Sequence, residues 1–143
     1  MAEPAKAAKP LPLPDPVTRP FWDSLKAHAI QLQRCQACHR LIYYPRPVCP
    51  GCGGADLVWT SVSGRGVVHA FTIPHRHPHP AFGAHVPYVV ALVELEEGAR
   101  MLTNLVDVEP TPQAVRVGLP VEIVYDDVSP EITLPRFRPR RAP

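Results

Sequence analysis

The chain lacks any hydrophobic run near the ~20 apolar residues that a membrane helix needs. Its opening stretch, MAEPAKAAKPLPLPDP, carries lysines but no apolar segment of about 7–15 residues, so it does not resemble a secretory signal. The sequence therefore predicts a cytoplasmic protein without a membrane segment. Thiols stay reduced in that compartment, where clustered cysteines hold metal more often than they form disulfides.

Motifs of self-sufficient enzymes are also missing. The sequence has no P-loop, dinucleotide-binding fingerprint, H-E-x-x-H or G-x-S-x-G motif. Acidic residues cluster within residues 94–97 and 126–127. We expect these positions to be the rim of a hairpin and the end of a strand, and we interpret the acidic side chains there as solvated surface charges. We therefore predict no catalytic residue in this chain.

Neither sign of charge dominates, since the net charge is +2 and the sequence pI is about 8.4. A strong nucleic-acid binder usually has a pI above ~9 and one basic stripe, so this charge balance does not favour nucleic acid and indicates no particular partner. Positive charge gathers mainly in residues 134–141, LPRFRPRR. This tail is interpreted either as a frayed, solubilising end or as an extended arm whose Phe137 docks on a partner.

The first half of the chain predicts an extended leader and one short helix. Five prolines among alanines and lysines predict a disordered leader over residues 1–17. Thr18 is a candidate N-cap, and Pro20 suits the first helical turn. Phe21 and Trp22 lie on one helical face with Leu25 and Ala29. Residues 30–32 then alternate between apolar and polar, which predicts a short strand before the first cysteine pair.

From residue 57 onward the apolar period changes to two, as in β-strands. We predict strands near residues 57–63, 66–74, 87–96, 99–106 and 120–126, with a last extended piece at 131–135. Five or six short strands within about 80 residues favour a small antiparallel barrel, with a five-stranded OB-fold as the leading candidate. The predicted fold is mainly β: a helix and zinc ribbon over 18–54, an OB-fold domain over 55–139 and a tail over 140–143.

Four cysteines form two closely spaced pairs, Cys35-x2-Cys38 and Cys49-x2-Cys52, separated by ten residues. A two-residue spacer lets both sulfurs of a pair face one ion. Four thiolates complete a tetrahedral shell and leave no position for water or substrate, so we predict a structural zinc ion. Iron is the main rival ion, and two redox motifs or two disulfides are the alternatives without metal.

The residue after each second cysteine supports this interpretation. A metal knuckle tends to need a left-handed backbone at that place. Gly53 adopts it freely, and His39 occupies the equivalent place in the first pair, where histidine tolerates a positive φ. We therefore expect a positive φ at both residues.

A histidine- and proline-rich segment, residues 74–85, stands before the predicted strand at 87–96. His75, His77 and His79 would share one face of a strand and could ligate a metal. Prolines interrupt the segment, however, which favours a stiff, exposed loop at the barrel mouth. Such a loop either contacts a ligand or partner, with Arg76 offering its charge to phosphate, or is a plain surface loop.

Read together, these segments resemble the acyl-CoA-associated family of zinc-ribbon (rubredoxin-like) and OB-fold proteins, accessory subunits of thiolase-superfamily enzymes. The resemblance runs in family order over residues 19–139. It is carried by RPFWDSL, LQRCQACHR, YPRPVCPGCGG, VSGRGVVHAFT, PYVVALVELEEGARMLTNLV, VGLPVEIVYDD and LPRFRP.

The resemblance implies a non-catalytic subunit that works with a separate thiolase-like chain, such as a thiolase, a synthase or a lipid-transfer-type aldolase. It implies a hetero-oligomer, for instance of two plus two chains, with an acyl-CoA thioester as ligand of the complex. The candidate ligand or partner contacts are Phe21, Trp22, Arg65, His75, Arg76, His77, Phe82 and Phe137. For Phe21 and Trp22, packing against the protein's own barrel is an equally good interpretation.

The alternative function is a module that binds single-stranded nucleic acid, since zinc ribbons and OB-folds both serve that role. Such binders usually present stacking aromatic residues along a basic groove. The predicted strands are instead rich in valine, leucine and alanine. Only Phe71, Tyr88 and Tyr125 are available for stacking.

Overall fold

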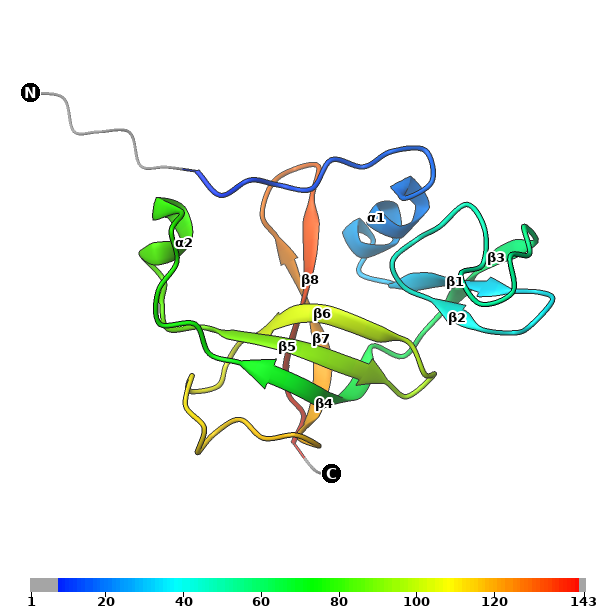
Figure 1. Ribbon diagram of the computed structural model, residues 1–143. Helices are drawn as coiled ribbons and strands as arrows, with labels where there is room; N and C mark the ends of the chain where they lie inside the picture. Colours follow the sequence, from blue (N-terminus) through cyan, green and yellow to red (C-terminus); the bar gives the residue numbers. More distant parts are fainter. Residues whose placement is uncertain (1–7, 142–143) are drawn as a thin grey trace, which may run out of the picture.

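Two β-sheets make up most of the computed structural model, which describes residues 8–141 (Figure 1). The elements follow one another as α1 (Arg19–Lys26), β1 (Gln31–Cys35), β2 (Leu41–Ile42), β3 (Leu57–Ser61), β4 (Arg65–Thr72), α2 (Pro80–Gly83), β5 (Val89–Leu95), β6 (Arg100–Leu105), β7 (Pro120–Asp127) and β8 (Thr133–Pro139). None of the helices within residues 8–141 has the length and hydropathy needed to cross a membrane.

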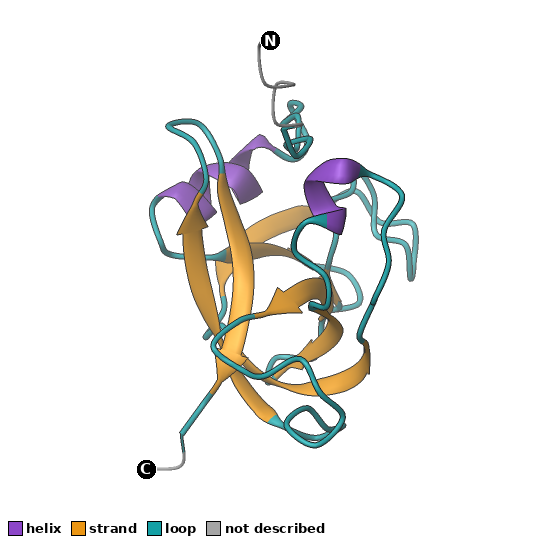
Figure 2. Cartoon of the chain, turned by 90° about the vertical axis from the view of Figure 1, so that its left-hand side faces the viewer, coloured by secondary structure: helices purple, strands orange, loops and turns teal. Residues whose placement is uncertain are grey.

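The second sheet is a closed barrel in which the strands are ordered β4-β5-β6-β8-β7. Every neighbouring pair is antiparallel except β6 and β8, which run parallel where Leu105 faces Phe137. The predicted mainly-β fold with a five-stranded OB barrel is confirmed, although the barrel is not wholly antiparallel. Figure 2 shows the two helices at the same end of this barrel, one on either side.

The predicted strand at 57–63 exists as β3, but it does not belong to the barrel. It pairs along its whole length with β1, from Gln31 opposite Ser61 to Cys35 opposite Leu57, in a sheet ordered β2-β1-β3. The reason is geometric, because the second cysteine knuckle returns the chain beside Cys35, next to the free edge of β1. The barrel therefore begins with β4.

The predicted tail is instead the barrel strand β8. It lies between β6 and β7, and its outward Arg136 and Arg138 alternate with inward-facing side chains. Phe137 faces inward and is 0% exposed. Both the frayed end and the partner-docking arm are therefore wrong, because the alternation of a half-buried strand was concealed by its prolines and arginines.

Helix α1 packs its apolar face against β1, β7 and β8. Phe21 is 0% exposed and lies edge-on against the rings of Trp22, Tyr43 and Tyr44. The indole Nε1 of Trp22 donates a hydrogen bond to the Tyr44 hydroxyl at 3.0 Å. Phe21 and Trp22 thus belong to the core that joins the ribbon to the barrel. The prediction that they contact a partner is wrong, since burial leaves them almost no surface to offer.

The leader has a defined path over residues 8–17, where disorder was predicted; residues 1–7 of that prediction lie outside the described residues. In Figure 1 the segment runs past the β7–β8 hairpin to α1. At its end, the Asp15 carboxylate accepts hydrogen bonds from the backbone N–H groups of Val17 and Thr18, both at 2.9 Å. The bond from Thr18 is the largest cause of the lowered pKa of Asp15. Thr18 is the N-cap as predicted, but its side chain makes no capping hydrogen bond; Asp15 instead holds the turn that leads into α1.

Gly66 allows β4 and β5 to approach closely where the barrel begins. A Cβ added there would clash with the carbonyl oxygen of Glu94, which is backbone and cannot move aside cheaply. We expect Gly66→Ala to lower the free energy of unfolding by about 1–3 kcal/mol, as overpacking does. Val67→Ala, at the exposed neighbouring position, should change it by less than about 0.5 kcal/mol in the same urea titration. Equal stability of the two variants would contradict this.

Candidate functional site

The four cysteine sulfurs converge at one end of the ribbon sheet. The Sγ atoms of Cys35 and Cys52 are 3.6 Å apart, as are those of Cys38 and Cys49, and all four lie within 4.8 Å of one another. A tetrahedral zinc ion with Zn–S bonds of ~2.3 Å requires sulfurs about 3.8 Å apart. The donor set and its spacing therefore fit a structural zinc ion.

The two cysteine pairs repeat the same backbone turn. His39 donates its N–H to the Cys35 carbonyl at 2.8 Å, and Gly53 does so to the Cys49 carbonyl at 2.8 Å. Both residues have a positive φ, 65° for His39 and 77° for Gly53, as predicted. The turn is thus set by the residue that follows each second cysteine.

Backbone N–H groups donate hydrogen bonds to two of the four sulfurs. The N–H of Gly51 donates to the Cys49 sulfur at 3.3 Å, and that of Gly54 to the Cys52 sulfur at 3.4 Å. Hydrogen bonds from the backbone of Cys52, and also of Gly51, lower the pKa of Cys49 to about 7 against the opposing effect of burial. Such donors favour the thiolate form that binds metal.

Histidines do not add a second metal cluster within the described part of the chain, where only the four cysteines gather as possible ligands. His77 and His79 instead hold their own loop. The Nδ1 of His77 accepts a hydrogen bond from the His79 N–H at 3.0 Å, and the Nδ1 of His79 accepts one from the Ala81 N–H at 3.1 Å. The second bond caps α2.

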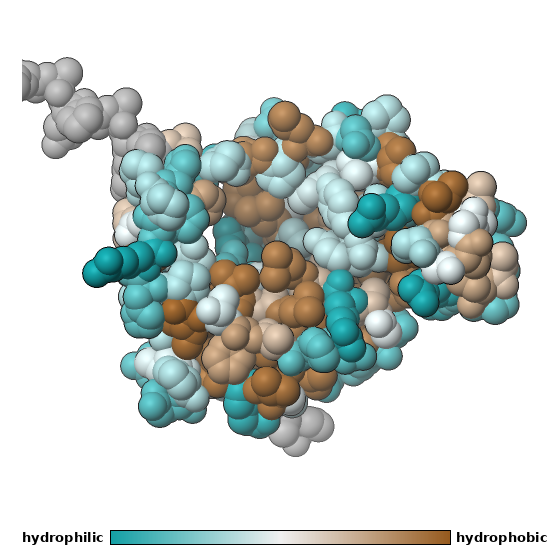
Figure 3. Space-filling view, in the orientation of Figure 1, coloured by the Kyte–Doolittle hydropathy of each residue, from teal (hydrophilic) through white to brown (hydrophobic). Residues whose placement is uncertain are grey.

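A groove of about 860 Å³ lies on the outer face of the barrel, between the loop that carries α2 and the leader. It is lined by Lys9, Pro10, Leu11, Pro12, His77, Phe82, His85, Tyr88, Val90, Leu102, Thr103, Asn104, Leu105, Val106, Asp126, Val128, Leu134 and Arg136. In Figure 3 the surface is hollowed beside the α2 segment, and hydrophobic surface lies next to the hollow. Strands β5 and β6 lie at the centre of the groove. They are the second and third strands of the barrel, and OB-folds bind extended ligands on the face that these two strands form.

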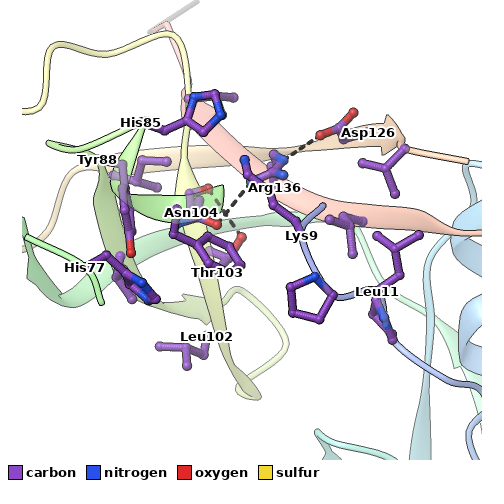
Figure 4. Close-up of a pocket in the computed structure, with 18 residues that line it drawn as sticks. Lys9, Leu11, His77, His85, Tyr88, Leu102, Thr103, Asn104, Asp126 and Arg136 are labelled. Atoms are coloured by element: carbon purple, nitrogen blue, oxygen red, sulfur yellow. Dashed lines mark hydrogen bonds and ion pairs between the residues drawn. The ribbon is translucent and has the colours of Figure 1, made fainter. Parts of the chain in front are cut away.

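Arg136 forms the polar centre of this groove (Figure 4). Its Nε donates to Asp126 Oδ2 at 2.6 Å, and its Nη1 donates to Asn104 Oδ1 at 3.1 Å. Asn104 is fixed in turn, because its Nδ2 donates to the Val89 carbonyl at 3.0 Å. The guanidinium is thereby held in one orientation by side chains of β6 and β7.

The predicted contact residues fall in different places. His77 and Phe82 line the groove, with ring centroids 4.8 Å apart. His75 and Arg76 are exposed in the same loop but outside the lining. Arg65 lies away from the groove, where its Nη2 is 3.5 Å from the Glu96 carboxylate.

The residues that sequence reasoning missed come from strands and from the leader. They are Lys9, Leu11, Leu102, Asn104 and Arg136. One signal was present, since Asn104 is a lone amide within the apolar run MLTNLV and faces outward from the third barrel strand. The remaining residues are brought together only by the barrel topology.

Two family models match consecutive parts of the chain. The model described as "ChsH2, rubredoxin-like zinc ribbon domain" matches residues 22–58, and "ChsH2, C-terminal OB-fold domain" matches residues 59–126. Together they cover the ribbon sheet and most of the barrel.

Individual proteins are similar over the same region. A probable enoyl-CoA hydratase alpha subunit of Thermomonospora curvata is 41% identical over 94% of this chain, which spans only 41% of that protein. A DUF35 domain-containing scaffold protein of Pyrococcus furiosus is 41% identical over 64% of each chain.

Among solved structures, a chain described as "Ltp2-ChsH2(DUF35) aldolase" has a TM-score of 0.77 and 40% identity. The match covers 90% of this chain and 98% of that one. By its ribbon, its barrel and these matches, the chain belongs to the ChsH2-type DUF35 family of zinc-ribbon and OB-fold proteins.

Proposed function

We propose that this chain is a zinc-binding accessory subunit that docks on a separate thiolase-like chain and helps it to hold an acyl-CoA thioester. The observation that carries the proposal is the similarity over nearly the full length of the ChsH2(DUF35) chain of an aldolase structure. The scaffold name of the archaeal relative agrees with a supporting role.

The metal site supports a structural rather than a chemical contribution. Four thiolates fill a tetrahedral zinc shell, so the ion has no position left for a substrate. Cys35 and Cys49 are buried at the end of the ribbon sheet, while Cys38 and Cys52 are exposed. The ion therefore braces the ribbon, and the partner chain supplies the reacting groups.

The groove supports the contact with acyl-CoA. It combines apolar walls with the cationic side chains of Lys9 and Arg136 and the nearby His77 and His85. Small-molecule sites are usually concave and apolar, with a few converging polar groups, and measure ~300–1,000 Å³. A coenzyme A thioester joins an apolar acyl group to an anionic carrier, which matches this combination.

Two of the three aromatic residues that could stack on the bases of a nucleic acid are engaged in contacts within the protein. Tyr125 stacks on His28 at 4.8 Å and accepts a hydrogen bond from the Ile30 N–H at 3.0 Å. Phe71 packs against the core. Tyr88 alone of the three candidates lines the groove. An OB-fold that binds single strands normally stacks successive bases on several aromatic side chains.

Co-expression with a thiolase-like protein encoded by the neighbouring gene tests the proposal. We expect the two chains to co-purify as one complex, and turnover of an acyl-CoA substrate to require both. The control is each chain purified alone. Turnover by this chain alone, or two chains that elute separately at about 10 μM each, would contradict it. Salt-sensitive retention of single-stranded DNA without any effect of acyl-CoA would favour the alternative.

A further inference from the structure

Arg40 connects the two cysteine pairs of the metal site. Its backbone carbonyl accepts the N–H of Cys35 at 3.0 Å, which closes the turn of the first pair. Its side chain reaches the second pair. A Cβ atom added to Gly51 would lie 2.8 Å from the Nε of Arg40 and 2.9 Å from its Cζ, so the guanidinium lies directly over this glycine. Arg40 therefore contacts both turns.

The glycine that the guanidinium covers also contacts a metal ligand. The N–H of Gly51 donates to the Cys49 sulfur at 3.3 Å. Because Gly51 has no side chain, the guanidinium of Arg40 can lie against its backbone. A positive charge is thereby placed on the residue whose N–H faces the Cys49 sulfur.

The filled metal site carries an excess of negative charge. Four thiolates around one Zn²⁺ ion leave about two negative charges on the site. Two of the sulfur ligands belong to buried residues, Cys35 and Cys49, where water screens charge less than it does at the surface. A cation held beside the site stabilises this charge, and groups behind the ligands commonly set the affinity for the metal.

The charge of Arg40 has no carboxylate partner among the described residues. Within residues 8–141, the arginines that form ion pairs with carboxylates are Arg65, Arg100, Arg136, Arg138 and Arg140. Glu94 lines the same small cleft as Arg40, but its carboxylate lies 4.0 Å from the Nε of Arg100. Arg34 also lacks a carboxylate, and its Nη1 donates to the His39 carbonyl at 2.8 Å. The guanidinium of Arg40 thus has the metal site as its anionic neighbour.

We propose that Arg40 is a positioning residue of the metal site, which joins the second cysteine pair to the first and balances the negative charge of the filled site. The inference rests on the structural zinc ion of the proposed function, but it involves neither a partner chain nor acyl-CoA. It makes zinc affinity depend on the positive charge of Arg40 and on the absence of a side chain at Gly51.

Titration of the reduced full chain in chelator-buffered zinc, with occupancy read by native mass spectrometry, tests the charge. We expect Arg40→Gln to bind zinc about tenfold more weakly, as is typical when a group behind a metal ligand is removed. Arg40→Lys keeps the charge without the planar guanidinium, so its affinity should stay within about threefold of that of the unchanged chain.

The matched control is Arg46→Gln, which removes one positive charge from the same ribbon. Arg46 is exposed, and its backbone rather than its side chain makes the hydrogen bonds to Gln33. This variant should bind zinc as the unchanged chain does. Equal zinc affinities of Arg40→Gln and Arg46→Gln would overturn the role of Arg40, and an Arg40→Lys variant as weak as Arg40→Gln would overturn the charge balance. A lack of zinc binding by the unchanged chain would overturn this role together with the structural metal.

Gly51→Ala tests the contact itself. The added methyl group would take the place of the guanidinium, which can move aside because it is the end of a flexible side chain, and the charge of the chain stays the same. We expect zinc binding to weaken about three- to tenfold. The double variant with Arg40→Gln should be no weaker than Arg40→Gln alone, because both changes remove one contact. Losses that simply add would overturn the contact between Arg40 and Gly51 as the cause.

Discussion

Removing the metal is expected to unfold the ribbon. Structural zinc contributes on the order of 10–16 kcal/mol to small metal-bound domains at neutral pH, whereas whole domains are stable by only about 5–15 kcal/mol. Strand β2 has only two residues, and the segment between Ile42 and Leu57 contains no strand. Apart from the contacts of Tyr43 and Tyr44 with Phe21 and two hydrogen bonds between Gln33 and Arg46, the four sulfurs fix this part of the chain. Both chelation and Cys35→Ser should therefore release the cysteine loops.

Tryptophan fluorescence gives a direct measurement of this change. The chain has two tryptophans, Trp22 on α1 and Trp59 on β3, and both lie with the ribbon rather than in a barrel strand. Chelation should shift the emission to longer wavelength, and added zinc should restore it. Val48→Ser is the matched control, since it alters an exposed side chain of the same loop without removing a sulfur. An unchanged emission spectrum and unchanged melting temperature in Cys35→Ser would contradict a structural metal.

Phe137→Ala should be the most destabilising change in the barrel. The Phe137 ring is fully buried, and its carbonyl accepts the Val106 N–H at 2.8 Å where β8 joins β6. Removing a buried phenylalanine ring typically costs about 3–5 kcal/mol, and the rigid barrel around it leaves little scope for collapse. Chemical denaturation followed by circular dichroism would measure the loss.

Its control lies at the next residue of the same strand. Arg138 faces solvent, and its Nε is 3.2 Å from the Glu122 carboxylate, a pair of the exposed kind that contributes little. Arg138→Ala should therefore change stability by less than about 1 kcal/mol. If Phe137→Ala were as stable as the unchanged chain yet failed to bind the partner, Phe137 would be an interface residue rather than a core residue.

The metal site could be predicted from sequence because its signal is local. The spacing of the four cysteines and the backbone needed at His39 and Gly53 are all contained in one short segment. The strands at β5 and β6 are similarly local, since each shows a clear period of two. In such segments, side-chain chemistry and backbone preference point to the same structure.

The tail and the aromatic helix were misinterpreted because burial depends on the whole fold. Phe137 lies among prolines and arginines that are typical of an exposed arm, yet β8 is needed to close the barrel between β6 and β7. Phe21 and Trp22 were correctly placed on one helical face. The sequence could not say whether that face meets a partner or the chain's own core.

The groove could not be predicted because its parts are distant in the chain. Lys9, His77, Asn104 and Arg136 come from the leader, a loop and two strands. Only the parallel junction of β6 and β8 brings Asn104 beside Arg136. No spacing rule connects such residues, so the polar centre emerges only with the topology.

Native mass spectrometry of the full chain, purified under reducing conditions without added metal, tests the account most directly. We expect a single bound zinc ion per folded chain, lost together with the ribbon structure when all four thiols are protonated by acid. A folded chain of unchanged tryptophan emission that carries neither zinc nor iron would contradict it.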